Sequence, residues 1–85
     1  MPAAIDDARH HAIAALLVQL RKERGWLQSE LARRLRKTQT FVSKYETGLR
    51  RLDVVELLDI LRALDADPHE FIDQVLAMPK SRLKS

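Results

Sequence analysis

The stretch from Gln28 to Gly48, QSELARRLRKTQTFVSKYETG, has the pattern of two short helices joined by a tight turn. In each half, apolar residues recur at the spacing that places them on one face of a helix. These residues are Leu31, Ala32 and Leu35 in the first half, and Phe41, Val42 and Tyr45 in the second. The pattern predicts two helices that bury these faces.

Three residues of this stretch set the limits and the packing of the two helices. Thr38 stands just before the second apolar set, where its hydroxyl can satisfy an otherwise unpaired N–H of the first helical turn. Gly48 follows the second helix, where a left-handed residue commonly ends a helix. Ala32 is the small side chain that two steeply crossing helices need at their point of closest approach. The second helix is therefore predicted at about residues 39–47.

Polar side chains remain on the outer face of the second helix. They are Gln39, Thr40, Ser43 and Lys44. Such short or flexible donors and acceptors can read base edges in the major groove of DNA. Taken alone, these residues would more often be an ordinary solvated face. Their place in a helix-turn-helix pattern favours base contact.

The stretch resembles the helix-turn-helix of the phage Cro and repressor type, the XRE-like family. The matching pieces are Gln28, Leu31–Ala32 and the run VSKYETG at 42–48, flanked by LRKERG at 20–25 and by residues 57–64. The resemblance covers roughly residues 13–72. It implies an all-α fold, a compact five-helix bundle of the phage-repressor-like DNA-binding type, with an extended first helix. It also implies a sequence-specific double-stranded DNA-binding transcriptional regulator, acting as a symmetric homodimer.

The resemblance also assigns roles to individual residues. The base-reading candidates are Thr38, Gln39, Thr40, Ser43 and Lys44. The phosphate-binding candidates are Gln28, Arg36, Arg50 and Arg51. For the two adjacent arginines, a solvated pair is as plausible from sequence alone, and their place after the second helix favours phosphate contact. A structural ion pair is expected between Arg21 and Glu46.

The chain departs from the family pattern at three positions. Leu27 stands where the family usually has Ser or Thr as a helix cap, and the missing cap costs about 1 kcal/mol. Arg36 stands where the turn often has Gly, and an Arg there costs about 1 kcal/mol if its backbone is left-handed. Lys37 occupies a position that is usually apolar.

Length and composition agree with one small helical domain. The chain has 85 residues, of which 46% are hydrophobic, with 2 Gly and 3 Pro. It contains no Cys, which suits a reducing cytoplasm, and we expect a cytoplasmic protein. The net charge of +3 permits a polyanionic partner without requiring one.

The remaining helices can be outlined from their caps and apolar spacing. We expect a frayed N-terminus at 1–5, a domain at 6–78 and a basic disordered tail at 79–85. The first helix should begin at Asp6 and Asp7 and end near Gly25, with Ile13, Leu17 and Leu20 on one face and Leu16 off it. Capping boxes are predicted for the last two helices, at Asp53 with Glu56 and at Asp67 with Glu70. The fourth helix is expected to bury Leu57, Leu58, Leu61 and Leu64.

The fifth helix has apolar residues on more than one face. We expect Ile72, Val75 and Leu76 to form a dimer seam, although mild surface exposure is the alternative. A rival function is an antitoxin-like protein-binding module that masks a partner protein and binds DNA secondarily. The long first helix and the basic tail would suit that role.

Catalytic and metal chemistry find little support in the sequence. We recognise no nucleophile with a base, no phosphate-binding loop and no acid pair, so we do not expect an enzyme. The acidic cluster at Asp65, Asp67, His69 and Asp73 could suggest a metal site. Two of these residues already explain a helix start, so we expect no metal and no cofactor.

Overall fold

The computed structural model describes residues 8–78, and in that range it contains five helices and no strand. They are α1 (Ala8–Glu23), α2 (Gln28–Leu35), α3 (Gln39–Glu46), α4 (Val54–Ala63) and α5 (Pro68–Leu76). The predicted all-α five-helix fold is therefore confirmed. The expected first turn at Asp6 and Asp7 and the two terminal segments lie outside the described residues, so the domain limits stay a prediction.

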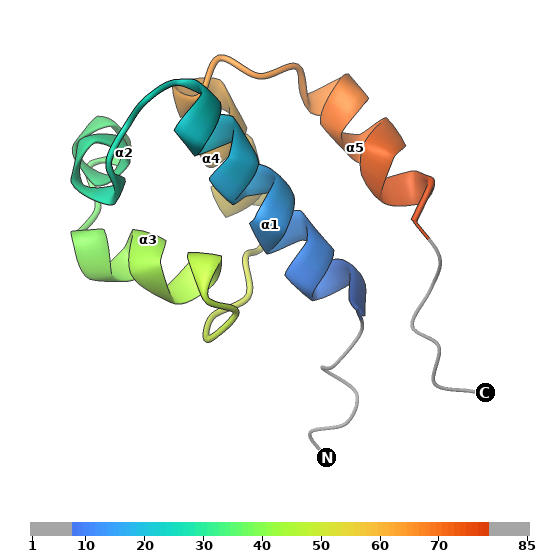
Figure 1. Ribbon diagram of the computed structural model, residues 1–85, viewed down its shortest axis with the longest axis horizontal. Helices are drawn as coiled ribbons and strands as arrows, with labels where there is room; N and C mark the ends of the chain where they lie inside the picture. The colour runs from blue at the N-terminus through green and yellow to red at the C-terminus, as the bar shows by residue number, and fades with distance from the viewer. Residues whose placement is uncertain (1–7, 79–85) are drawn as a thin grey trace.

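The helix α1 runs through the middle of the molecule (Figure 1). The helices α2 and α3 pack against each other on one side of it, and α5 lies on the other side. The helix α4 contacts both α2 and α5. Because α1 packs between α3 and α5, it must present apolar residues on two sides.

The helices α1 to α4 all end in the same way. One or two residues after the last helical residue, the backbone is left-handed, with φ of 75° at Gly25, 58° at Arg36, 84° at Gly48 and 56° at Asp65. This residue and the next one donate hydrogen bonds back to the last helical turn, as in the Schellman motif. After α2, for example, the Arg36 N–H bonds to Arg33 O and the Lys37 N–H bonds to Ala32 O. The short connections between helices follow from these tight ends.

Of the two capping boxes predicted from the sequence, the structure contains one. The capping box at α4 is confirmed, because Asp53 Oδ1 accepts from the Glu56 N–H at 2.7 Å and Glu56 Oε1 accepts from the Asp53 N–H at 3.0 Å. The prediction for α5 is half wrong. Asp67 does cap this helix, with Pro68 in its first turn, but its carboxylate accepts from the His69 N–H instead of completing a box with Glu70.

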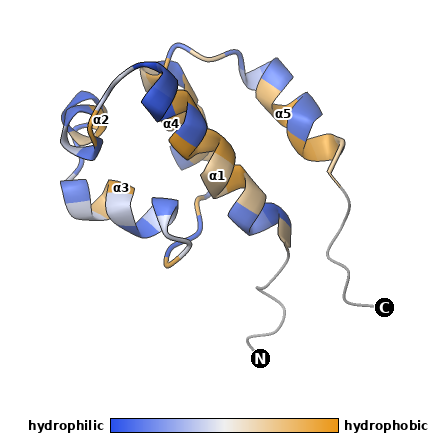
Figure 2. Ribbon diagram, viewed as in Figure 1, coloured by the Kyte–Doolittle hydropathy of each residue, from blue (hydrophilic) through white to orange (hydrophobic). Residues whose placement is uncertain are grey.

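One core joins all five helices. Its fully or nearly buried members are Leu17, Leu31, Ala32, Val42, Tyr45, Ile60, Leu61, Leu64 and Phe71. The predicted inner faces of α2 and α3 are thus confirmed, with Leu35 and Phe41 half-buried at their edges. In Figure 2 the apolar residues gather on α1, α4 and one side of α5, whereas α2 is largely hydrophilic on its outside.

Two predictions about burial are wrong, one on α4 and one on α1. Leu58 is 46% exposed, whereas Ile60 is 1% exposed and lies in the core. The buried stripe of α4 runs through positions 57, 60, 61 and 64, and Leu58 falls one residue off it. Leu16 was expected off the buried face of α1, yet it packs against the core. The reason is that α1 has neighbours on two sides.

Candidate nucleic-acid interface

The start of α3 is fixed by Thr38. Its backbone is extended, and its Oγ1 accepts a hydrogen bond from the Phe41 N–H at 3.1 Å. This is the cap expected from the sequence, and it holds the first turn of α3 in place. Because the hydroxyl oxygen already accepts this bond, Thr38 has less freedom to bind a base than the residues that follow it.

The end of α3 is fixed by Gly48. With φ at 84°, this residue allows the Leu49 N–H to bond back to Lys44 O at 2.9 Å. A Cβ at this position would lie 3.3 Å from two ring atoms of His11, so α1 also approaches the turn closely here. A side chain at this position would therefore meet both backbone strain and crowding.

The outer face of α3 is polar and unengaged. Gln39, Thr40 and Lys44 are exposed and Ser43 is half-buried, whereas Val42 and Tyr45 on the opposite face are buried. In residues 8–78, the side chains of these four polar residues form no hydrogen bond or ion pair with the rest of the chain. Their donors and acceptors are therefore available to an external ligand.

The C-terminal end of α3 is held against α1 by an ion pair between Arg21 and Glu46. Arg21 Nε donates to Glu46 Oε2 at 2.7 Å and Arg21 Nη2 donates to Glu46 Oε1 at 3.0 Å. Only 10% and 5% of the two side chains are exposed. The third donor, Nη1, bonds to the carbonyl of Trp26 at 2.7 Å. The hydrogen bonds from Arg21 to Glu46 raise the pKa of Arg21 against the opposing effect of burial.

Gln28 joins the same cluster. Its Nε2 donates to Glu46 Oε1 at 2.8 Å, and the residue is half-buried at the start of α2. One carboxylate thus connects α1, the start of α2 and the end of α3. Gln28 was expected to bind phosphate, and its contact with Glu46 was not predicted from the sequence. Because its amide nitrogen carries two hydrogens, one donor remains after the bond to Glu46.

Arg50 is also engaged within the chain. Its Nη1 and Nη2 donate to the two carboxylate oxygens of Glu56 at 2.9 and 2.7 Å. Its guanidinium carbon lies 4.9 Å from the centre of the Phe41 ring. The hydrogen bond from Arg50, together with that from the Asp53 N–H, lowers the pKa of Glu56 to about 2. The pair fastens the loop after α3 to the start of α4.

The other phosphate candidates remain at the surface. Arg36 lies in the turn between α2 and α3, and Arg51 lies in the loop after α3. Both are exposed, and in the described part of the chain neither side chain has a hydrogen-bond or ion-pair partner. Lys37 lies with its Nζ 5.4 Å from the Phe41 ring centre, so this exposed cation rests on an aromatic face. Cations therefore flank α3 at both ends.

Comparison with known proteins agrees with this geometry. A helix-turn-helix family model matches residues 17–71, which include α2, α3 and α4. The chain belongs to the XRE-like helix-turn-helix family. An XRE-family like protein from Pseudomonas syringae pv. tomato str. DC3000 shares 44% identity, with a TM-score of 0.79, over 84% of this chain and 87% of that one. The resemblance inferred from the sequence is thereby confirmed.

More distant members of this XRE-like fold share the architecture. The restriction-modification controller protein C.Esp1396I, solved as a tetramer in complex with its natural 35 base-pair operator, has 22% identity and a TM-score of 0.74 over 80% of this chain and 90% of that one. The clp gene regulator ClgR from C. glutamicum has 24% identity and a TM-score of 0.72 over 80% of this chain and 87% of that one. Among curated proteins, no match to the chain was found.

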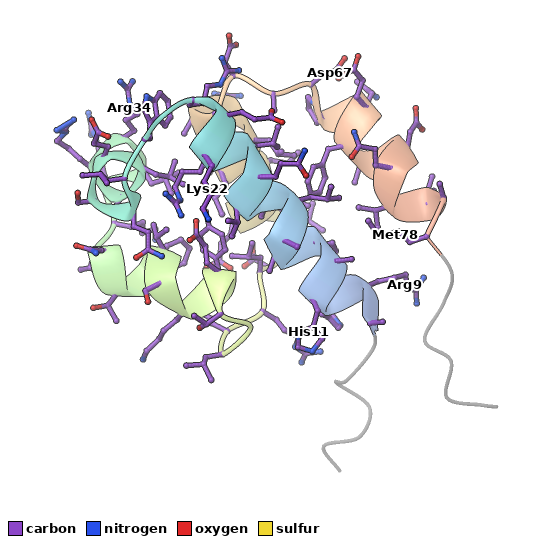
Figure 3. All side chains as sticks on the ribbon, in the orientation of Figure 1. Arg9, His11, Lys22, Arg34, Asp67 and Met78 are labelled. Carbon is purple, nitrogen blue, oxygen red and sulfur yellow. The ribbon has the colours of Figure 1, made fainter. Side chains whose placement is uncertain are left out.

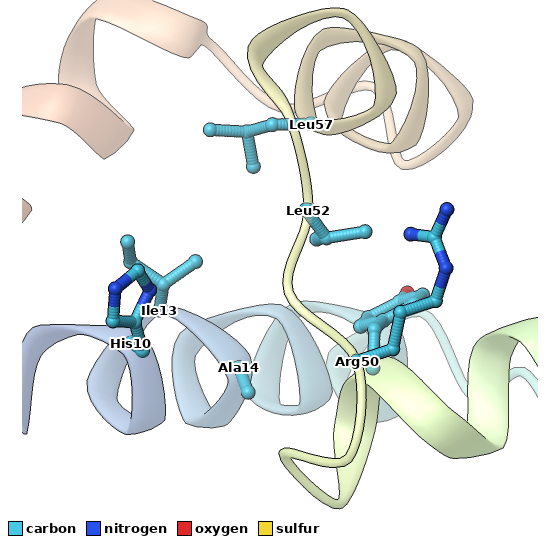
Figure 4. A pocket seen from close by; sticks show the side chains of 7 residues that line it. His10, Ile13, Ala14, Arg50, Leu52 and Leu57 are labelled. Carbon is cyan, nitrogen blue, oxygen red and sulfur yellow. The ribbon is translucent and has the colours of Figure 1, made fainter. Parts of the chain in front are cut away.

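A small cavity lies on the inner side of α3, beside Tyr45. It measures about 50 Å³ and is lined by Tyr45, His10, Arg50 and apolar side chains (Figure 4). The Tyr45 hydroxyl is buried and has no hydrogen-bond partner among the described groups, and burial raises its pKa. A cavity of this size is too small for an organic cofactor. We therefore regard Tyr45 as a core residue.

Within residues 8–78, no three His, Cys, Asp or Glu side chains lie together so that they could hold a metal ion. No helix in that range is long and apolar enough to cross a membrane.

Proposed function

We propose that this chain is a sequence-specific double-stranded DNA-binding transcriptional regulator that inserts α3 into the major groove. One observation carries the proposal. Within residues 8–78, the outer face of α3 presents four polar side chains without partners, while its inner face and both ends are fixed to the rest of the domain. A rigid helix with free donors and acceptors is what direct reading of base edges requires.

Each side chain has a chemical role in this proposal. Gln39 can pair bidentately with adenine, Lys44 can donate to guanine, and Thr40 can offer its methyl group to thymine. Ser43 and the donor hydrogen of Thr38 add weaker contacts at the groove edge. Arg36 and Arg51 bind phosphates, which position the protein without reading sequence. Gln28 adds its remaining amide hydrogen.

Arg50 has a conditional role. Its guanidinium is held by Glu56, so a phosphate must share the guanidinium with this carboxylate or displace it. Of the two adjacent arginines, Arg51 therefore carries the stronger phosphate contact. This ordering could not be inferred from sequence, in which the two residues look equivalent.

A homodimer completes the proposal. Two copies related by a two-fold axis would present two α3 helices about 34 Å apart, one DNA turn, to a near-palindromic site. A controller protein of this fold has been solved as a tetramer on its operator, which supports assembly on DNA in this chain as well. Such a regulator acts where the DNA is, in the cytoplasm.

Selection of bound duplexes from a random pool tests the proposal. We expect one preferred sequence, which binds more tightly than a scrambled duplex. Its affinity should fall with salt, and the slope of log affinity against log salt concentration should be about −0.9 for each phosphate neutralised. Failure to enrich any sequence, or an affinity that does not change with salt, would contradict DNA reading.

Variants then distinguish the residues that read bases from those that bind phosphates. Gln39→Ala and Lys44→Ala should each cost about 1–3 kcal/mol on the preferred site and relax its sequence preference. Arg51→Ala should weaken all duplexes alike and lower the salt slope by about one. Lys22→Ala, an exposed cation on α1, is the matched control and should change neither quantity. If Gln39→Ala and Lys44→Ala weaken binding to the preferred and the scrambled duplex equally, the placement of α3 in the major groove is wrong.

A further inference from the structure

A basic hollow lies between α2 and α4, apart from the outer face of α3. It has a volume of about 290 Å³ and is lined by Arg34, Leu35, Arg36, Asp59, Arg62 and Ala63. Figure 3 shows Arg34 projecting from α2 on the side away from α3. None of the base-reading candidates lines this hollow, and of the phosphate-binding candidates only Arg36 does.

The charge of the hollow is strongly positive. Three arginines face one carboxylate, that of Asp59. The guanidinium of Arg34 stacks on Trp26, with its carbon 4.0 Å from the ring centre. Stacking fixes the plane of this group but uses none of its N–H donors. Arg62 is exposed on α4, and in the described residues it forms no ion pair. The hollow therefore offers several forked donors suited to carboxylates.

An apolar groove continues from the hollow. This groove has a volume of about 180 Å³, and it shares Leu35 and Asp59 with the hollow. Its other apolar lining residues are Phe41, Ile60 and Val55, and its other charged ones are Lys37, Asp53 and Glu56, of which Glu56 is paired with Arg50. Val55 is 67% exposed, although it is a large aliphatic residue at the start of a helix. Val55 therefore contributes exposed apolar surface to this groove.

We propose that the hollow and groove together bind an acidic amphipathic segment of a partner protein. Carboxylates of the segment pair with Arg34 and Arg62, and an apolar side chain fills the groove beside Val55. Duplex DNA fits this surface poorly, because its phosphate backbone has no apolar group for the groove. Since the surface lies away from the outer face of α3, a DNA-bound copy could recruit this partner.

A designed peptide probes the surface directly. The probe is a fluorescein-labelled helix of about 16 residues with Leu at i, i+3, i+4 and i+7 and Glu elsewhere. Added to the ¹⁵N-labelled full chain, it should shift the amide signals of Arg34, Arg36, Val55 and Arg62. A control peptide with Lys in place of Glu should not bind. Absence of binding by the acidic peptide, or equal binding of the lysine peptide, would overturn the proposal.

Variants with a matched control sharpen the test. Arg34→Gln combined with Arg62→Gln should weaken peptide binding about tenfold or more, because charge-assisted hydrogen bonds are lost. Val55→Ser should weaken it as well. Arg33→Gln is the control, since Arg33 is an exposed cation of α2 outside the hollow, and it should change binding less than about twofold. Thermal unfolding of each variant verifies that the domain remains folded.

The location of the shifts decides between occupants. Shifts confined to the outer face of α3 would mean that the peptide imitates DNA, and shifts on α5 would mean that it occupies a self-association surface. Displacement of the peptide by an unrelated duplex would assign the hollow to DNA. Each of these three results would overturn the proposal, and none depends on whether the operator has been found.

Discussion

Arg36 holds a backbone conformation that its side chain disfavours. Its φ of 58° ends α2 in the same motif that Gly25 and Gly48 form after α1 and α3. A residue with a Cβ in this region costs about 1–2 kcal/mol, and Asp65, which ends α4, belongs to a residue type that tolerates it better. A strained cation in the turn of a helix-turn-helix is consistent with a functional charge at this place.

Arg36→Gly should therefore raise the free energy of unfolding. The relief of strain is partly offset by the greater entropy of Gly in the unfolded chain, so the expected net gain is about 0.5–1 kcal/mol in urea denaturation. Arg33→Gly, in the exposed part of α2, is the control and should cost about 0.5–1 kcal/mol. A loss of stability in Arg36→Gly would show that the arginine side chain stabilises the turn. The same variant should bind every duplex more weakly if Arg36 holds a phosphate.

At the scale of elements, one carboxylate connects three helices. Glu46 accepts hydrogen bonds from Arg21 on α1 and from Gln28 on α2 while it belongs to α3. Removal of either member of the nearly buried pair leaves the other uncompensated, and we expect Arg21→Ala or Glu46→Ala to cost about 3 kcal/mol. The double variant should cost clearly less than the sum, as a double-mutant cycle by urea unfolding would measure. Additive losses would mean that the two side chains do not stabilise each other.

The pair of Arg50 and Glu56 gives the domain an acid-sensitive contact. The pKa of Glu56 is about 2 in the folded chain and about 4.3 in an unfolded chain. Because the folded value is lower, the contribution of this carboxylate is fully present above about pH 5 and is lost as the pH falls toward 2. Glu56→Gln should therefore flatten the decrease of stability between these values, and the effect should be modest because the pair is at the surface. Unchanged acid unfolding in this variant would contradict the lowered pKa.

Apart from the contact between Arg21 and Glu46, which the family resemblance implied, the contacts predicted from the sequence are those between near neighbours. Thr38, Gly48 and the Asp53–Glu56 box are local, so residue type and spacing were sufficient to place them. The engagement of Gln28 depends on the crossing of α2 and α3, and the engagement of Arg50 depends on how the loop after α3 returns to α4. The rotation of α4 about its axis depends on all of its neighbours, so Leu58 was wrongly expected in the core and the burial of Ile60 was not predicted.

At the scale of the whole molecule, the described surface carries three separate regions. The polar face of α3 suits DNA, and the hollow between α2 and α4 suits an acidic partner. The third region is the outer side of α5, where Ile72 is 43% exposed and Leu76 is 75% exposed. Val75, the other residue of the expected seam, instead packs against the core. A dimer closed by α5 would leave the first two regions open.

Self-association should therefore depend on Ile72 and Leu76. Replacement of both by Glu places charge in an apolar seam, and should weaken dimerisation at least tenfold in analytical ultracentrifugation without unfolding the domain. Leu27→Glu is the control, because Leu27 is 67% exposed at the start of α2, and it should leave the assembly unchanged. Val75→Glu should unfold the domain instead. A wild-type chain that stays monomeric even on its selected duplex would contradict the seam, as would a Glu double variant that dimerises normally. Since a palindromic site needs two copies, the same double variant should bind a half-site as well as the wild type does and lose its preference for the full site.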